Sequence, residues 1–324
     1  MRRLVAACLT ATVLTGCGGV GADDPLQVTD TLTAAEPARA PDQPARPAGT
    51  VVPAPPTALS AFLPGASTLA TAHERTVSLY DARDLRRAPR TVRLPAAPAT
   101  LRATPDGKLL AAQPDADLVA RIDPATGTAE QLRYPGRPLD AALVPGGLAV
   151  ALEATGSVAL PGGKQATGFK RPAELVELGG RLHVLDVLAT SLTPVDPATG
   201  EKEPALRAGT GATHVAADRY DRVLAVDTRG QELLAFATDP LIMKQRYPVP
   251  GAPFALAYDP GRDLAWITLT ASNELVGYDV AGGEPREVHR VPTVRQPNSA
   301  AVDPATGAVF VASATGAGMQ VVTP

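Results

Sequence analysis

The sequence has few cysteine, histidine and aromatic residues, and its body contains no long apolar segment. Only two cysteines occur among the 324 residues, together with four His and one Trp. Acidic and basic residues are nearly balanced, 33 against 30, which excludes the strongly basic surface typical of nucleic-acid-binding proteins. After residue 17 no segment approaches 18 uncharged apolar residues, so we expect no transmembrane helix there.

Proline and glycine are abundant by contrast, with 33 Pro and 29 Gly spread along the whole chain. Both residues interrupt helices and favour turns. Their distribution therefore argues against a helical bundle and predicts many short segments joined by turns.

The N-terminus is typical of an export signal. Two arginines at positions 2 and 3 precede residues 4–14, which are uncharged and mostly apolar but too few to span a bilayer permanently. The following Leu14-Thr15-Gly16-Cys17 resembles the lipobox of bacterial lipoproteins. This resemblance implies a signal peptide over 1–16, lipidation of Cys17, and attachment to the extracytoplasmic face of the cell membrane. Cys8 would leave with the signal, so no disulfide is expected.

Residues 17–48 are expected to form a tether. The segment is rich in Pro and Ala with charges interspersed, which leaves little apolar surface to offset the entropy of ordering it. We expect it to be disordered or extended, as a spacer between membrane and domain. The Pro and Ala excess and the preference for Arg over Lys indicate a high-GC genome, such as that of an actinobacterium.

A sequence repeat of about forty residues occurs seven times between residue 49 and the C-terminus. The units begin, at intervals of 34 to 44 residues, at Pro56, Pro98, Pro138, Pro172, Ala212, Pro253 and Pro297. Each unit contains four short β-rich segments separated by turns. The pentapeptide Asp-Pro-Ala-Thr-Gly, at 123–127, 196–200 and 303–307, supplies hairpin turn chemistry within the units without being the repeat itself.

These observations predict an all-β, seven-bladed β-propeller over residues 49–324, in which each four-stranded unit is one blade. The segments Val77-Ser78-Leu79-Tyr80-Asp81 and Leu275-Val276-Gly277-Tyr278-Asp279 are alike, and Leu264-Ala265-Trp266-Ile267-Thr268 precedes the second. In these segments the chain resembles the YVTN-repeat, or YncE-like, propellers. WD40 propellers are a poorer match, because no Trp-Asp dipeptide occurs.

The last unit has only three evident strands before the chain ends at Pro324. Residues 49–59 parallel residues 90–101, whose first part is an outer strand. We therefore predict that residues 50–52 complete the seventh blade and close the ring, which would leave no unpaired edge.

Equivalent positions on the seven innermost strands, two residues after each unit begins, suggest a channel site. They are Ala58, Thr100, Asp140, Glu174, His214, Ala255 and Ser299. Two carboxylates and one imidazole from consecutive blades could bind a divalent metal such as Zn²⁺ or Mn²⁺, or a cationic ligand, so Asp140, Glu174 and His214 are the candidate metal ligands. A polar, water-filled channel without metal is the simpler alternative.

Three arginines, Arg137, Arg171 and Arg295, directly precede or nearly precede the unit starts. They are candidates for a ring at one channel mouth that attracts an anionic ligand, although solvated loop charges are the simpler interpretation.

Catalytic motifs are absent from the sequence: there is no Gly-x-Ser-x-Gly elbow, no P-loop and no His-Glu-x-x-His. We therefore favour a membrane-anchored monomer that binds or scaffolds a protein or cell-envelope ligand, with no nucleic-acid partner. A lactonase-like propeller hydrolase is one alternative, and a metal or small-ligand carrier that uses the channel is another.

Overall fold

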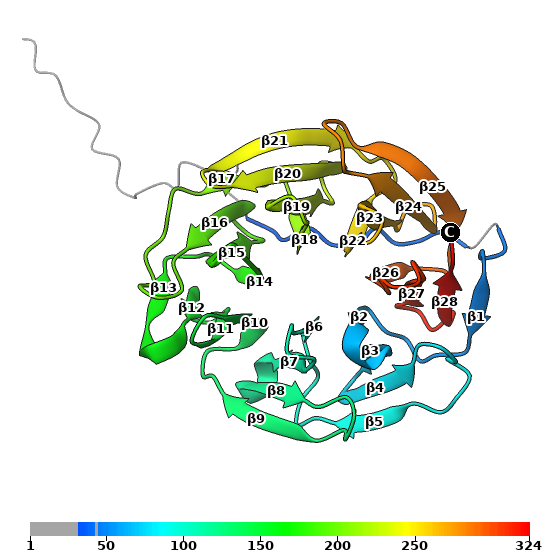
Figure 1. The fold of residues 1–324 in the computed structure, drawn as a ribbon, viewed down its shortest axis with the longest axis horizontal. Coiled ribbons are helices and arrows are strands. Elements are labelled where there is room, and N and C mark those ends of the chain that lie inside the picture. The colour runs from blue at the N-terminus through cyan, green and yellow to red at the C-terminus, as the bar shows by residue number, and fades with distance from the viewer. Residues whose placement is uncertain (1–31, 43–44) are drawn as a thin grey trace, which may run out of the picture.

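The computed structural model describes residues 32–42 and 45–324. These residues form seven four-stranded antiparallel sheets arranged as blades around a central axis (Figure 1). The predicted all-β, seven-bladed propeller is thus confirmed. Six blades are meanders of four consecutive strands, whereas the seventh combines three C-terminal strands with one N-terminal strand.

The strand bounds follow the predicted units. The first blade contains β2 (Leu59–Leu63), β3 (Thr68–His73), β4 (Thr76–Asp81) and β5 (Arg90–Arg93). The second contains β6 (Thr100–Ala103), β7 (Leu109–Gln113), β8 (Leu118–Ile122) and β9 (Ala129–Arg133). The third contains β10 (Pro138–Val144), β11 (Gly147–Leu152), β12 (Ser157–Ala159) and β13 (Gln165–Thr167). The fourth contains β14 (Pro172–Leu178), β15 (Arg181–Asp186), β16 (Ser191–Val195) and β17 (Leu206–Arg207).

The remaining blades continue the same order. The fifth contains β18 (Ala212–Ala217), β19 (Arg222–Asp227), β20 (Glu232–Thr238) and β21 (Leu241–Pro248). The sixth contains β22 (Pro253–Asp259), β23 (Leu264–Leu269), β24 (Glu274–Asp279) and β25 (Arg286–Pro292). The seventh contains β26 (Pro297–Val302), β27 (Val309–Ser313), β28 (Met319–Val322) and β1 (Thr50–Val52).

Helical structure in the described residues is limited to three short 3-10 turns, η1 (Pro64–Ala66), η2 (Pro114–Ala116) and η3 (Pro161–Gly163). None of these described helices is long and apolar enough to cross a membrane.

The core lies between blades, because each sheet is covered on both faces by its neighbours. The second strands show this directly: every residue of β7 and of β23 is buried, without the alternation of a half-exposed strand. Trp266 packs in one cluster with Val309 and Val311 of the seventh blade. Tyr278 packs with Leu224 of the fifth. Both aromatic residues are thus interblade packing residues.

The repeated turn pentapeptide acts as predicted. A carboxylate oxygen of Asp123 accepts hydrogen bonds from the backbone N–H groups of Ala125 and Thr126, at 2.8 and 3.3 Å. The Gly127 N–H closes the turn on the Asp123 carbonyl at 2.8 Å, with φ at +76°. This conformation explains the glycine at the fifth position.

The N-terminal strand closes the ring, as predicted. Strand β1 pairs antiparallel with β28, so that Thr50 lies opposite Val321 and Val52 opposite Met319. Val52 is buried in a cluster that includes Phe62 of the first blade. The pairing of β1 with β28, here called the clasp, therefore joins both strands to the junction between the last and first blades.

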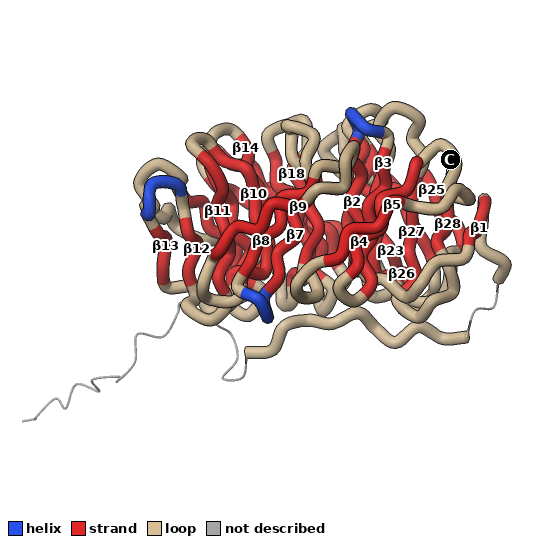
Figure 2. Tube along the Cα trace, turned by 90° about the horizontal axis from the view of Figure 1, so that it is seen from below, coloured by secondary structure: helices blue, strands red, loops and turns tan. Residues whose placement is uncertain are grey.

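Residues 33–42, here called the strap, lie extended along one face of the propeller before the chain reaches β1 (Figure 2). This face, the strap face, carries the loops that join second to third strands and the connections between blades. The strap belongs to the segment expected to be a tether, and its contacts with the propeller were not predicted.

Side chains of three consecutive blades hold the strap by its backbone. Thr270 Oγ1 accepts from the Ala38 N–H at 3.0 Å, and Gln296 donates to the Ala38 carbonyl at 2.9 Å while accepting from the Ala40 N–H at 2.8 Å. Nearer the N-terminus of the strap, Arg229 donates to the Thr33 carbonyl at 2.8 Å. Because these bonds are to backbone groups, an extended Pro- and Ala-rich segment suffices to make them.

Candidate functional site

The channel wall is built from the equivalent inner-strand positions that the sequence analysis selected. A cavity of about 140 Å³ within the ring is lined by six of the seven positions. These are Ala58, Thr100, Glu174, His214, Ala255 and Ser299. The repeat alignment therefore places these side chains correctly, whereas Asp140 does not line this cavity.

Asp140 is fully buried and is held by the blades on either side. Its carboxylate forms an ion pair with Arg102 of β6 and accepts the Leu175 N–H of β14 at 2.8 Å. Burial disfavours the charged Arg102 guanidinium, but the charge of Asp140 and the hydrogen bond to it outweigh this and raise the pKa of Arg102. Asp140 therefore links three consecutive blades instead of facing the channel.

Glu174 makes a similar link one blade further on. Its Oε2 accepts the Val215 N–H of β18 at 2.8 Å, while its Oε1 lies 3.8 Å from His214 Nε2. Burial raises the pKa of Glu174 to about 8, against the opposing charge of Arg102. Burial also lowers the pKa of His214 to about 4. Near pH 7 both side chains are therefore neutral.

A β-bulge recurs at the start of five inner strands and sets the direction of these side chains. The register shifts lie between Pro138 and Asp140, between Pro172 and Glu174, and at the matching places in β18, β22 and β26. A bulge re-aims the side chain next to it. These bulges were not predicted from the sequence, yet the equivalent positions of six blades still line one cavity.

The predicted metal set is not assembled as a coordination site. Glu174 and His214 are adjacent, but Asp140 is committed to Arg102 and to backbone amides. Nowhere in residues 32–42 and 45–324 do three His, Cys, Asp or Glu side chains converge as a metal site requires. The geometry therefore disfavours a metal at this trio, because the Asp140 carboxylate is already bound by Arg102 and by the Leu175 N–H.

Arg102 is the residue of this cluster that the sequence analysis missed. It lies two positions after Thr100 on the same inner strand, and alternate residues of a strand share a face. The two-residue spacing from Thr100 could therefore have indicated that the Arg102 guanidinium lies near the carboxylates of Asp140 and Glu174.

A second, larger cavity of about 280 Å³ opens toward the strap face. It shares Thr100, Glu174 and His214 with the first cavity, so these residues lie between the two. Ala34 and Ala35 of the strap form part of its lining. We call it the strap-side cavity.

The three candidate arginines lie in the connections of the strap face, but their charges are already balanced. Arg137 contacts Asp115 at 2.8 Å and Glu153 at 3.1 Å, and Arg171 contacts the same Glu153 at 2.8 Å. Arg295 lies 3.6 Å from Asp42 of the strap. Such pairing does not favour a ring of free cations for an anionic ligand.

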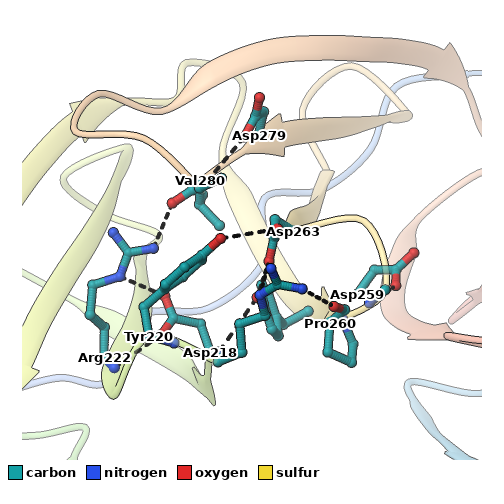
Figure 3. Close-up of polar contacts among 12 residues, drawn as sticks. Asp218, Tyr220, Arg222, Asp259, Pro260, Asp263, Asp279 and Val280 are labelled. Atoms are coloured by element: carbon teal, nitrogen blue, oxygen red, sulfur yellow. Dashed lines mark hydrogen bonds and ion pairs between the residues drawn. The ribbon is translucent and has the colours of Figure 1, made fainter.

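On the face opposite the strap, loops that join first to second strands of the fifth and sixth blades carry a dense polar cluster. Figure 3 shows its side chains. Asp263 accepts hydrogen bonds from the hydroxyls of Tyr220, at 3.1 Å, and Tyr258, at 2.9 Å. Arg222 donates to Asp218 at 2.6 Å and to the Val280 carbonyl at 2.5 Å. These bonds connect loops of two blades.

Tyr220 and Arg219 are the exposed members of this cluster. Tyr220 is 40% exposed, and the side chain of Arg219 is 52% exposed. Both are fixed nonetheless: Arg219 contacts Asp263 at 3.0 Å and donates to the Pro260 carbonyl at 3.2 Å. Tyrosine and arginine are among the residue types enriched at the energetically important positions of protein interfaces.

The predicted lipidation site, Cys17, and the signal peptide 1–16 lie outside the described residues. They remain predictions from the sequence.

Comparisons with known proteins support the fold and nothing finer. No protein-family model and no curated protein matches the sequence. Among solved structures, hydrazine synthase from Kuenenia stuttgartiensis is 16% identical with a TM-score of 0.69, over 86% of this chain and 99% of that chain. The Cps50 (Swd1) β-propeller domain from Myceliophteria thermophila is 15% identical with a TM-score of 0.70, over 85% and 98%.

Virginiamycin B lyase from Staphylococcus aureus, in a catalytically inactive variant with quinupristin, is 14% identical with a TM-score of 0.70, over 86% of this chain and 99% of that chain. These similar structures differ widely in function, and such low identities carry no activity from one protein to another. What the comparisons and the structure together identify is a seven-bladed β-propeller.

Proposed function

We propose that this chain is a lipid-anchored propeller on the extracytoplasmic face of a cell membrane, where it binds or scaffolds a protein or cell-envelope ligand. The docked strap is the observation that supports this role most. It fixes the N-terminal segment to one face, so an anchor at Cys17 would hold that face toward the membrane. The opposite face, with Tyr220 and Arg219, would then be presented outward.

Docking of the strap also limits how far the propeller can lie from an anchor at Cys17. Only 15 residues separate Cys17 from Thr33, where docking begins. Fully extended, the chain from Cys17 to Thr33 spans at most about 55 Å. The propeller would thus stay near the membrane with a preferred orientation. A tether that was flexible over all of residues 17–48 would instead allow roughly twice this distance.

Anchoring is tested with the two cysteines as a matched pair. Expressed at full length in an actinobacterial host, the wild type and Cys8→Ser should incorporate labelled fatty acid and partition into detergent, whereas Cys17→Ser should do neither. Equal partitioning of all three proteins would show that Cys17 is not the anchor.

The partner surface is tested by chemical cross-linking on intact cells. Tyr220→Ala and Arg219→Ala should lose the cross-linked envelope component that the wild type retains. Ile242→Ala alters another exposed apolar side chain, on the outer strand β21, and should retain it. If all variants cross-link alike, the opposite face is not the binding surface.

A further inference from the structure

We propose that the strap-side cavity is a binding site for a small, uncharged and mostly apolar ligand that carries a hydrogen-bond acceptor, and that the strap forms its roof. This site is separate from the outward face assigned to the partner. It therefore goes beyond the proposed function and does not depend on lipidation.

The size and lining of the cavity fit such a ligand. At about 280 Å³ it is nearly twice the size of a cavity that holds benzene, which is about 150 Å³. Leu139, Val187 and Phe254 supply apolar walls, while Glu174 and His214 supply polar groups at the junction with the inner cavity. Apolar walls with a few convergent polar groups are characteristic of small-molecule sites.

The charges around Glu174 are balanced, which selects against an ionic ligand. Arg102 is paired with Asp140, and Arg171 is paired with Glu153. His214, whose ring lies 4.7 Å from that of Phe254, is neutral near pH 7 because burial lowers its pKa. A charged ligand would lose hydration here without gaining an unpaired counter-charge.

Glu174 supplies the hydrogen-bond donor. Its Oε2 is occupied by the Val215 N–H, which leaves Oε1 as the site for the proton of the neutral acid. A protonated carboxyl group donates one hydrogen bond. A carbonyl or ether oxygen on the ligand is the matching acceptor.

The roof depends on a close approach between the strap and the fifth blade. A Cβ at Gly211 would lie 2.8 Å from the Cβ of Ala35 and from that of Arg229. Only glycine at this position lets the strap lie where Ala34 and Ala35 line the cavity. Ala35 itself lines the cavity, so a larger side chain there is expected to reduce the space for a ligand.

Three matched probes test the ligand class by titration calorimetry on the full chain at pH 6.5. Acetophenone is uncharged with an acceptor, ethylbenzene has a similar shape without one, and benzoate is anionic. We expect acetophenone to bind about five- to tenfold more tightly than ethylbenzene, the factor worth one hydrogen bond, and benzoate to bind least. Equal affinities, or no acetophenone binding at millimolar concentration, would overturn the proposal.

Two variants locate the site. Ala35→Phe should abolish acetophenone binding, while Ala97→Phe, at an exposed position of the same face that does not line this cavity, should leave it unchanged. Glu174→Gln keeps an acceptor for Val215 and a donor for the ligand. Wild-type affinity should fall as the pH rises from 7 to 9, whereas the affinity of Glu174→Gln should not change with pH. Retained binding in Ala35→Phe would contradict the proposed site.

Discussion

At the scale of single residues, polar side chains on the inner strands connect blades. Thr100 donates to the Leu139 carbonyl at 2.9 Å, Asp140 accepts from Leu175, and Glu174 accepts from Val215. Each bond joins one inner strand to the next, where buried backbone groups need partners. Residue types that suggested metal ligation in the sequence thus have a structural role.

The Arg102–Asp140 pair should be strongly coupled. Asp140→Asn leaves the Arg102 guanidinium without its counter-charge and should lower the free energy of unfolding by about 3 kcal/mol. The double variant Arg102→Met/Asp140→Asn should lose less than the sum of the two single changes, because no uncompensated charge remains. Urea denaturation of the four proteins measures this coupling, and simple additivity would argue against the buried pair.

Glu174 should make stability depend on pH. Its folded pKa of about 8 lies above its ordinary value of 4.5, so the folded state binds the proton more tightly and loses stability as the pH rises between these values. His183 and His214 have folded pKa values lowered to about 4, so their contribution changes only below pH 6.5. Between pH 6.5 and 8 the effect of Glu174 is therefore isolated.

In that window the stability of Glu174→Gln relative to the wild type should rise by about 1.4 kcal/mol per pH unit at most. The amide preserves the bond from Val215 but cannot ionise. Urea denaturation at pH 6.5, 7.2 and 8.0 measures the difference. A difference that does not vary with pH would mean that the carboxyl group is already ionised at pH 6.5.

At the scale of elements, the clasp depends on backbone contacts as much as on side chains. Gly49 has φ at +67°, and a Cβ there would lie 2.1 Å from the Val321 carbonyl oxygen of the paired strand. The glycine thus serves two needs, a left-handed conformation and close passage beside β28.

Gly49→Ala should therefore destabilise the protein more than Gly107→Ala. Gly107 has a similar φ of +76° but an open surrounding, so its substitution carries only the conformational penalty of about 1 kcal/mol. The difference between the two melting temperatures measures the clash with β28. Equal losses would indicate that the strands of the clasp can move apart to fit the added Cβ without a measurable loss of stability.

At the scale of the whole molecule, stability depends on closing a ring of sheets that cannot bury their faces alone. Each blade covers its neighbours, and the seventh blade is completed only when the N-terminal strand joins the C-terminal three. Without β1, the edge of β28 and the cluster around Phe62 and Val52 become exposed.

Deleting residues 1–53 removes both the strap and the clasp strand. We expect the melting temperature to fall by at least about 10 °C, since several kcal/mol of burial and pairing are lost. A deletion of residues 1–31 retains every described contact and serves as the control. Similar melting temperatures for the two deletions would show that closure contributes little.

Much of the architecture was predictable because it repeats. The spacing of the units indicated the seven blades, and the parallel between residues 49–59 and 90–101 indicated the clasp. The strap was not predictable, because its bonds are to backbone groups of Ala38 and Ala40, which any extended segment could offer. The orientation of Asp140 was missed because its ion pair with Arg102 and its hydrogen bond from the Leu175 N–H decide it.

The sequence by itself determined the number of blades, the positions of the turns and the residues available to the channel, since these follow from local periodicity and turn chemistry. Only the tertiary structure decided which of those side chains line the cavity and which, like Asp140, do not. Contacts between blades commit Asp140 to Arg102, leave Glu174 and His214 neutral beside a cavity, and seat the strap as its roof. Such contacts join residues 35 or more positions apart, so no local pattern encodes them.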